Sequence, residues 1–226
     1  GQHGAGLLDR FGQLLGMSVA LTALMCEEEA SRIVIGRIAD HHIQVARGYL
    51  AAGAEAGWLA DDYAGEAGPF LRPAVWRRVL LPELARIIAV YRQAGAPVFF
   101  HTCGRAEVFI PDLLDIGVTV FNLQSDVCDT ARLKAQYGRR IAFYGGVASD
   151  LMLRGPAEAI VAAGRTAIET LGREGGLILA PDQPLAYPAG HLAALAKAAQ
   201  RYGRYPRCDA HHGSISATES TIRPGR

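Results

Sequence analysis

The segment FFHTCG at residues 99–104 contains two side chains that commonly bind metal ions. His101 and Cys103 are two residues apart at the end of a predicted strand, so their side chains point to the same face. An imidazole nitrogen and a thiolate at that spacing can bind one zinc ion at about 2.0–2.3 Å, and at least one more ligand is then needed. The alternative is structural: a buried histidine bonded to the backbone beside a small apolar cysteine.

Two adjacent carboxylates, Asp61 and Asp62, follow another predicted strand and precede Tyr63. A pair of carboxylates at the edge of a sheet suits proton transfer, or the binding of a cationic or pyrrole N–H substrate. We therefore assign a joint catalytic role to Asp61 and Asp62. One of the two could instead cap a turn or a helix, as aspartate does in many loops that follow strands.

Polar residues or glycines also follow the later predicted strands. Asp182 could supply a metal oxygen or orient a substrate, although an aspartate close to a proline is also a common turn residue. Gly145 could let a substrate approach the backbone, or serve a turn that needs a positive φ angle. The predicted metal ligands are His101, Cys103 and Asp182, and the predicted substrate contacts are Tyr63, Asn122, Tyr144, Gly145 and Gln183.

Short apolar runs alternate with amphipathic segments along the chain, and these elements must position the candidate residues. Such alternation of strands and helices predicts an α/β fold with a parallel sheet. Strands are predicted at residues 54–60, 97–100, 118–122, 141–144 and 177–180, and the clearest helices at 27–52, 74–94 and 190–202.

The polar residues gather just after the predicted strands, which is typical of a (β/α)8 TIM barrel. The active site of that fold is built from several strand ends at one rim. A doubly wound sheet would more often show a G-x-G-x-x-G motif after its first strand, and none is present there. Five strand–helix units are recognisable, so we expect a barrel that lacks about its first three units.

Composition limits the possible partners and compartment. The 226 residues are 50% hydrophobic and carry a formal net charge of +1, without a run of Lys or Arg. This balance argues against nucleic acid and anionic membranes as partners, and it favours a small molecule. No apolar stretch approaches the ~20 residues that span a bilayer, and the N-terminus lacks a secretory pattern. Four scattered cysteines argue against a disulfide framework, so we expect a cytoplasmic protein.

The domain organisation follows from the same features. Because the chain begins at Gly1 without a methionine, we expect a fragment or a trimmed product. The barrel domain is predicted to cover residues 1–206. Residues 207–226 are rich in Ser, Thr, Gly and His and lack an apolar period, so they are predicted to form a disordered tail.

Several motifs occur in an order that resembles the uroporphyrinogen decarboxylase family. They are DDYAG at 61–65, GPFLRP at 68–73, LP at 81–82, HTCG at 101–104, IPDL at 110–113, AFYGGV at 142–147, GGLILAP at 175–181 and YGRYP at 202–206. The resemblance covers approximately residues 1–206 and implies the barrel fold of that family.

This resemblance implies one of two activities. In the methyltransferase branch, a His-x-Cys motif and a later cysteine hold zinc; His101 and Cys103 match the motif, whereas Gln183, next to Asp182, stands at the later position. The implied mechanism is zinc-assisted methyl transfer, in which a thiol activated by zinc accepts the methyl group of a corrinoid protein. The decarboxylase branch acts on uroporphyrinogen III without a cofactor. It has a histidine in the late loop, which this chain lacks, and its essential Asp and Tyr would precede Gly1.

The His-x-Cys match favours the methyltransferase branch, with Asp61 and Asp62 lining the pocket. Decarboxylation in porphyrin biosynthesis is the alternative, in which these carboxylates hold pyrrole N–H groups and no metal is needed. A third hypothesis is an inactive relative that binds a tetrapyrrole or a partner protein. An incomplete barrel exposes two sheet edges that a partner, such as a second copy in a homo-oligomer, would have to cover.

Overall fold

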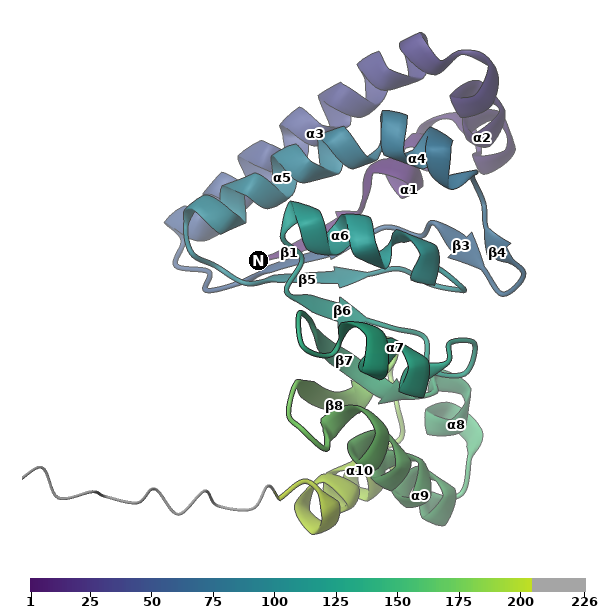
Figure 1. Cartoon of the computed structure of the whole chain (residues 1–226), viewed down its shortest axis with the longest axis vertical. Helices are drawn as coiled ribbons and strands as arrows, with labels where there is room; N and C mark the ends of the chain where they lie inside the picture. The colour runs from purple at the N-terminus through teal and green to yellow at the C-terminus, as the bar shows by residue number, and fades with distance from the viewer. Residues whose placement is uncertain (205–226) are drawn as a thin grey trace, which may run out of the picture.

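The computed structural model describes residues 1–204, which contain a six-stranded parallel sheet (Figure 1). Its strands, in order across the sheet, are β1 (Gln2–Ala5), β2 (Gly57–Ala60), β5 (Val98–His101), β6 (Val120–Asn122), β7 (Ala142–Val147) and β8 (Leu177–Pro181). A short antiparallel pair, β3 (Ala64–Gly65) and β4 (Gly68–Pro69), follows β2. Parallel strands that neighbour one another in chain order form the wall of a (β/α)8 barrel.

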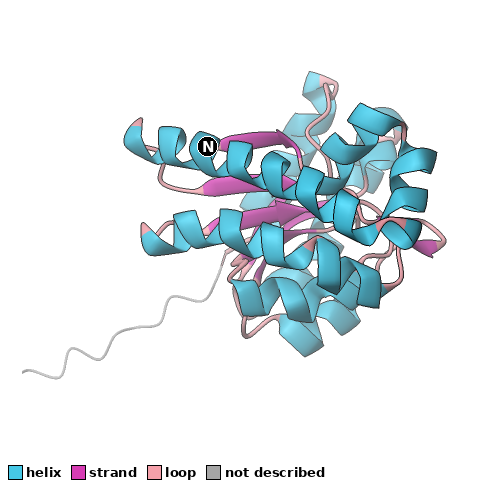
Figure 2. Ribbon diagram, turned by 90° about the horizontal axis from the view of Figure 1, so that it is seen from above, coloured by secondary structure: helices cyan, strands magenta, loops and turns pink. Residues whose placement is uncertain are grey.

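Helices connect the strands, and Figure 2 shows the long ones running alongside the sheet. The chain passes from β1 to β2 through α1 (Leu7–Leu15), α2 (Met17–Cys26) and α3 (Glu28–Ala51). Next come α4 (Pro73–Val79) and α5 (Leu81–Gln93) before β5, η1 (Glu107–Phe109) and α6 (Ile110–Ile116) before β6, and α7 (Thr130–Tyr137) before β7. The last group is α8 (Ser149–Arg154), α9 (Ala157–Ala167) and the π-helical turn η2 (Ile168–Gly172) before β8, and α10 (Ala189–Tyr202) after it.

One face of the sheet forms the core with the helices. Side chains alternate between the two faces of a strand. Leu59, Phe100, Phe121 and Phe143 are buried on the helix side, in one cluster with residues of α3 and α5 such as Ile35. The apolar residues that made each strand recognisable in the sequence therefore become the core of the domain.

The opposite face, which we call the inner face, is only partly covered. The strand register places Trp58 beside Phe99, and both are half-buried. Their rings stack with centroids 5.5 Å apart, and Trp58 meets the ring of Tyr144 edge-on at 5.0 Å. His101 and Asn122 lie further along the same face. The inner face therefore combines an aromatic floor with polar residues at the strand ends.

The structure confirms the fold class predicted from the sequence but corrects several elements. Within residues 1–204 the sheet has six strands rather than the five predicted, because the segment before the first predicted strand supplies β1. The strand predicted at 54–60 begins only at Gly57. The helix predicted at 74–94 is two helices that meet at Leu80. Pro82 explains the break, because it lacks the N–H that would bond the carbonyl of Arg78 in a continuous helix.

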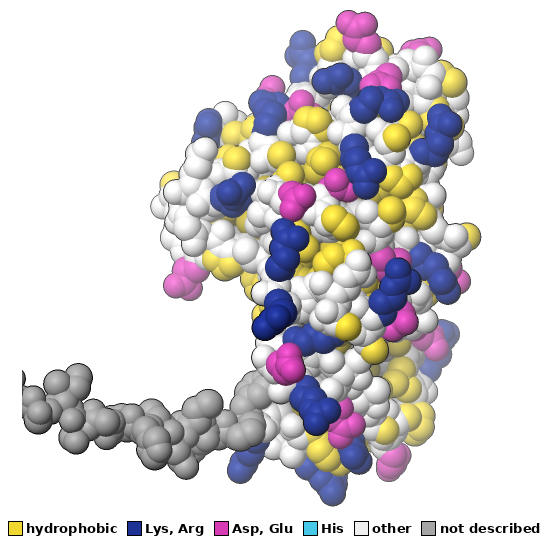
Figure 3. Space-filling model, in the orientation of Figure 1, with side chains coloured by type: hydrophobic (Ala, Val, Ile, Leu, Met, Phe, Trp, Pro, Cys, Tyr) yellow, Lys and Arg dark blue, Asp and Glu magenta, His cyan; other side chains and the backbone are white. Residues whose placement is uncertain are grey.

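The surface carries charges of both signs. Figure 3 shows basic and acidic side chains interspersed over one face, without a large area of one sign. Within residues 1–204, no helix is both long enough and apolar enough to cross a membrane. The predicted tail at residues 207–226 lies outside the described residues.

Candidate functional site

The candidate residues meet where the parallel strands end. The register pairs His101 of β5 with Ala60 at the end of β2 on one side and with Asn122 at the end of β6 on the other. Asp62 and Cys103 follow β2 and β5 within two residues. Asp62 and Cys103, 41 positions apart in the sequence, are therefore brought to one edge of the sheet, which is where TIM-barrel enzymes place their active sites.

Asp62, His101 and Cys103 form a compact cluster, which we call the triad. One ligand atom from each of them lies within 4.8 Å of the others. The His101 Nε2 atom is 3.3 Å from the Cys103 Sγ atom. The backbone N–H of Cys103 donates a hydrogen bond of 2.8 Å to Asp62 Oδ1, which fixes the carboxylate beside the thiol.

The triad fits a zinc ion. Zn–N and Zn–S bonds of about 2.0 and 2.3 Å at a tetrahedral angle place the two ligand atoms about 3.5 Å apart, close to the separation of His101 and Cys103. One nitrogen, one sulfur and one oxygen ligand leave a fourth position open, as catalytic zinc sites require. The other ring nitrogen of His101, Nδ1, is buried without a hydrogen-bond partner, so Nε2 is the atom directed at the cluster.

Cys103 is poorly placed to ionise without a cation. Burial, reinforced by the negative charge of Asp62, raises the pKa of the Cys103 thiol to about 12. The amide of Gln183 partly opposes this effect, because its Nε2 donates to the sulfur at 3.4 Å. A thiolate at this position therefore needs a nearby positive charge, which a metal ion provides.

Asp61 points away from the triad and caps α1. Its Oδ2 accepts hydrogen bonds from the backbone N–H groups of Leu7 (2.8 Å) and Leu8 (3.0 Å), and its Oδ1 accepts one from Asp9 (2.9 Å). The first N–H groups of a helix lack partners within the helix, and a carboxylate satisfies them well. Asp61 is fully buried, and burial together with the charge of Asp9 raises its pKa to about 7. The two adjacent aspartates thus lie in different environments.

Asp9 lies next to Asp62 in the structure, and the sequence analysis did not select it. Its Oδ2 accepts a hydrogen bond of 3.3 Å from the backbone N–H of Asp62, and it is half-buried. Burial and the nearby charge of Asp62 raise the pKa of the Asp9 carboxyl to about 6. An aspartate in the first turn of a helix is so common that the sequence alone gave no reason to select it.

Asp182, which follows β8, forms hydrogen bonds with residues at the ends of β6 and β7 and is not part of the triad. Its Oδ2 accepts from the backbone N–H (2.7 Å) and hydroxyl (2.6 Å) of Ser125, and its Oδ1 accepts from Gly146 N–H (2.8 Å). Asn122 Nδ2 donates to the Asp182 carbonyl at 3.1 Å. Gly145 and Gly146 lie within β7, not in a turn, and both have positive φ angles, of 112° and 100°.

The sequence matches the family model "Uroporphyrinogen decarboxylase (URO-D)" over residues 11–202. The chain belongs to this family. A "methyltransferase from Methanosarcina mazei" is a similar solved structure, with a TM-score of 0.75 and 21% sequence identity, and the match covers 88% of this chain and 58% of that chain. No curated protein sequence matches the chain.

The family assignment made from the sequence motifs is therefore confirmed. The likeness to the Methanosarcina protein supports the URO-D barrel fold. At 21% identity, this structural match is evidence for the fold and not for the activity. This chain spans 58% of the length of that methyltransferase.

The remaining predicted contact residues of this URO-D family member lie in three places. Tyr63 is buried on the helix side, and its ring stacks against Phe100. Tyr144 belongs to the aromatic floor of the inner face. Gln183 contacts Cys103 directly and so lies beside the triad.

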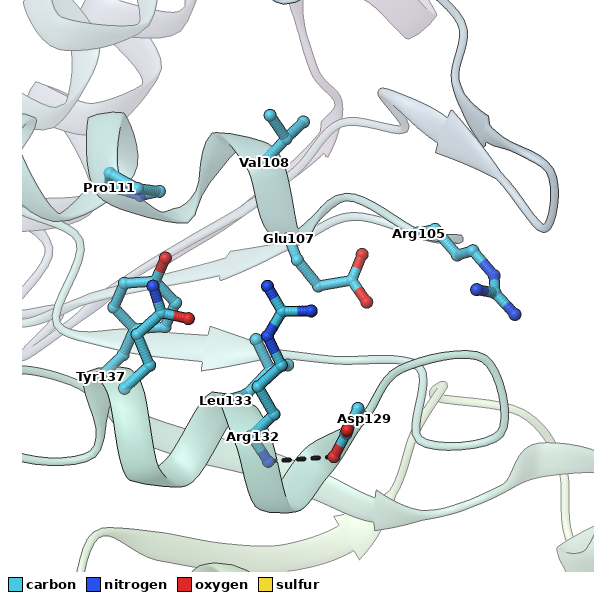
Figure 4. Close-up of a pocket in the computed structure, with 9 residues that line it drawn as sticks. Arg105, Glu107, Val108, Pro111, Asp129, Arg132, Leu133 and Tyr137 are labelled. Carbon is cyan, nitrogen blue, oxygen red and sulfur yellow. Dashed lines mark hydrogen bonds between the residues drawn. The ribbon is translucent and has the colours of Figure 1, made fainter.

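A separate hollow of about 520 Å³ opens between α7 and the η1–α6 segment of the URO-D domain (Figure 4). Glu107 and Arg132 face each other across it, and the backbone N–H of Arg132 donates to Asp129 at the start of α7. None of the triad residues lines this hollow. We therefore place the candidate active site at the triad and not at this groove between helices.

Proposed function

We propose that this chain carries the thiol-activating metal site of a URO-D-family methyltransferase, which transfers a methyl group from a corrinoid protein to a small thiol. The observation that supports this proposal is the triad of Asp62, His101 and Cys103, whose three ligand atoms converge within 4.8 Å at the strand ends. Zinc held there would supply Lewis-acid chemistry that lowers the pKa of a substrate thiol.

The protein's own residues prepare this site. The backbone of His101 is held on β5 between two paired strands, and its ring Nε2 lies 3.3 Å from the Cys103 Sγ atom. The backbone N–H of Cys103 holds Asp62, and the amide of Gln183 holds the Cys103 sulfur. These contacts fix the three ligand atoms before any metal binds, which reduces the entropy lost on binding.

The surroundings suit a small substrate. Trp58, Phe99 and Tyr144 offer an apolar floor on the same face as His101, where they exclude water from the reacting thiol. The carboxyl group of Asp9, whose pKa of about 6 leaves it ionised at neutral pH, is our candidate to accept the thiol proton. Asp61 acts indirectly in this proposal, because it anchors the helix that carries Asp9.

Zinc content measured by elemental analysis after dialysis against a weak chelator tests the proposal. We expect one zinc ion per chain in the wild type and almost none in the His101→Ala/Cys103→Ala double variant. Cys128→Ala is the matched control, because Cys128 is a second half-buried cysteine whose Sγ contacts the carbonyl of Gly104 without joining the triad. Asp62→Asn is expected to weaken zinc binding by about 10-fold or more, as the loss of a charged ligand does.

Absence of zinc from the wild type would contradict the proposal. Activity toward uroporphyrinogen III without metal would then support the decarboxylase alternative. A metal-free protein that binds a tetrapyrrole without turnover would support an inactive relative.

A further inference from the structure

Two buried polar atoms on neighbouring strands have no hydrogen-bond partner within residues 1–204. They are the Nδ1 atom of His101 and the Oδ1 atom of Asn122. His101 ends β5, Asn122 ends β6, and the register of the sheet pairs the two residues directly. Nearly all buried polar atoms in proteins have a partner, so two unpartnered atoms on paired residues call for an explanation.

The hydrogen bonds of Asn122 fix the orientation of its amide. The Nδ2 atom donates to the carbonyl of Tyr144 at 2.9 Å and to that of Asp182 at 3.1 Å. Only the NH2 group of an amide can donate to two carbonyls, so the nitrogen and oxygen positions cannot be exchanged. The NH2 group therefore points toward β7 and the segment after β8. The oxygen is left on the opposite side of β6, where β5 and His101 lie.

The contacts of the triad determine which nitrogen of the His101 ring carries the proton. The Nε2 atom must be unprotonated to bind a metal ion, so the neutral ring then carries its proton on Nδ1. The same tautomer suits the metal-free protein, because Nε2 lies 3.3 Å from the Cys103 Sγ atom and can accept its S–H. Among the described residues, Nδ1–H is then a donor without an acceptor and Asn122 Oδ1 an acceptor without a donor. The two atoms are complementary.

We propose that Asn122 is the positioning residue of His101, and that its Oδ1 accepts a hydrogen bond from the Nδ1–H of that ring. This role rests on the metal site proposed for the triad, because the metal requires a ring of fixed tautomer and orientation. A histidine that binds a metal through one ring nitrogen is normally held by a hydrogen bond from the other. The χ2 angle of histidine is broad, so a rotation of the ring brings Nδ1–H to the oxygen without moving the strand.

The ring of His101 needs this support because the sheet fixes only its backbone. Strand β5 is paired on both sides, but the side chain can still turn about two bonds. The amide of Asn122 is itself held by its two hydrogen bonds to the carbonyls of Tyr144 and Asp182, so it is a rigid acceptor. The position of the ring is thereby tied to β7 and to the segment after β8 as well as to β5.

The ¹⁵N NMR spectrum of metal-free, histidine-labelled protein at pH 8 reports the tautomer, and the His101 signals are assigned by their loss in His101→Ala. We expect the proton on Nδ1 in the wild type. Asn122→Leu and Asn122→Asp both keep the branched shape of Asn122 and lose its two N–H donors, but only Asn122→Asp retains an acceptor oxygen. The ring should therefore shift toward the Nε2–H tautomer in Asn122→Leu and keep the proton on Nδ1 in Asn122→Asp.

Zinc affinity, measured by competition with a chromophoric chelator, gives a second readout. We expect Asn122→Leu to bind zinc about 10–100-fold more weakly than the wild type, and Asn122→Asp to lose much less, because only the first removes the acceptor of a metal-binding histidine. Thr119→Val is the control for loosened strand pairing, since Thr119 Oγ1 bonds the backbone of Val98 at the opposite end of β5 and β6. It should keep the wild-type tautomer and zinc affinity.

Three results would overturn the role of Asn122. The first is a wild-type ring with its proton on Nε2, which can be detected even if Asn122→Leu does not fold. The second is a folded Asn122→Leu variant with the wild-type tautomer and zinc affinity. The third is an equal loss of both in Asn122→Asp or Thr119→Val. A wild type that binds no zinc would instead contradict the metal site, whereas an Nδ1–H tautomer that is lost in Asn122→Leu would still support the contact with His101.

Discussion

Gly145 occupies a position at which the structure leaves no room for a side chain. Its φ angle is 112°, a backbone conformation that L residues with a Cβ rarely adopt. A Cβ atom at this position would lie 2.9 Å from Asp182 Oδ1 and 3.2 Å from Asn122 Nδ2. Gly145→Ala therefore combines backbone strain with a collision against the residue that joins the later strand ends.

The two costs can be estimated separately. A positive φ angle costs an alanine about 1–2 kcal/mol relative to glycine. Moving the Asp182 carboxylate disrupts its hydrogen bond of 2.8 Å with Gly146, and hydrogen bonds to charged groups contribute about 1.5–3 kcal/mol. We expect Gly145→Ala to lower the free energy of unfolding by about 2.5–5 kcal/mol in total, from these two terms.

Urea denaturation followed by circular dichroism measures this loss, and the chain offers a matched control. Gly175 also has a positive φ angle, of 87°, but a Cβ atom there would meet nothing within 4 Å. Gly175→Ala should therefore show the strain alone, about 1–2 kcal/mol.

A double-mutant cycle isolates the collision. In an Asp182→Ala background, Gly145→Ala should cost less than in the wild type, since the carboxylate at 2.9 Å has gone and only the contact of 3.2 Å with Asn122 Nδ2 remains. Equal losses for Gly145→Ala and Gly175→Ala in the wild-type background would refute the reasoning.

Three further measurements test other parts of the structure. Asp61→Ala leaves three backbone N–H groups of α1 without their acceptor and should lower the free energy of unfolding by about 3 kcal/mol in urea denaturation. Burial lowers the pKa of His3 to about 4 and also lowers that of His42, so the stability that these histidines contribute is fully present above pH 6.5 and falls toward pH 4, whereas the raised pKa values of Asp61 and Asp9 stabilise the folded state as the pH falls from 7 to 5. His3→Phe lacks the loss due to His3, so its urea midpoint should shift upward relative to that of the wild type between pH 7 and pH 5, and the same change in both proteins would contradict this. In metal-free protein at pH 7, iodoacetamide should modify exposed Cys26 much faster than Cys103, whose pKa is raised to about 12, as peptide mapping can show.

The sequence was most informative where contacts are local. The spacing of His101 and Cys103 predicted two neighbouring side chains at a strand end. In the structure His101 is the last residue of β5 and Cys103 follows it, and the His101 Nε2 and Cys103 Sγ atoms are 3.3 Å apart. The apolar runs around Leu59, Phe100 and Phe121 predicted the strands correctly, because strands covered by helices need apolar residues there.

The roles of several polar residues depend on contacts between distant parts of the chain, which the sequence could not show. Asp61 and Asp62 are equivalent in the sequence, and only the position of α1 makes one of them a cap and leaves the other beside the thiol. Strand β1 has few apolar residues, so the sequence did not predict it. Its His3 is buried, and the two ring nitrogens of His3 form hydrogen bonds with His42 Nδ1 (3.0 Å) and with the Tyr91 hydroxyl (2.6 Å). Asp182 was a reasonable metal ligand by type, but its oxygens accept from Ser125 and Gly146 in the structure.

The two tryptophans of this chain lie on opposite sides of the sheet, so the fluorescence of each one reports on a different part of the protein. Trp76 is fully buried against Phe109 on the helix side, so its fluorescence reports whether the domain is folded. Trp58 lies half-buried on the inner face, stacked on Phe99 two residues before His101, and its emission should respond to a ligand that enters the site. Trp76→Phe would leave Trp58 as the sole indole, so binding of candidate substrates could be followed by fluorescence titration.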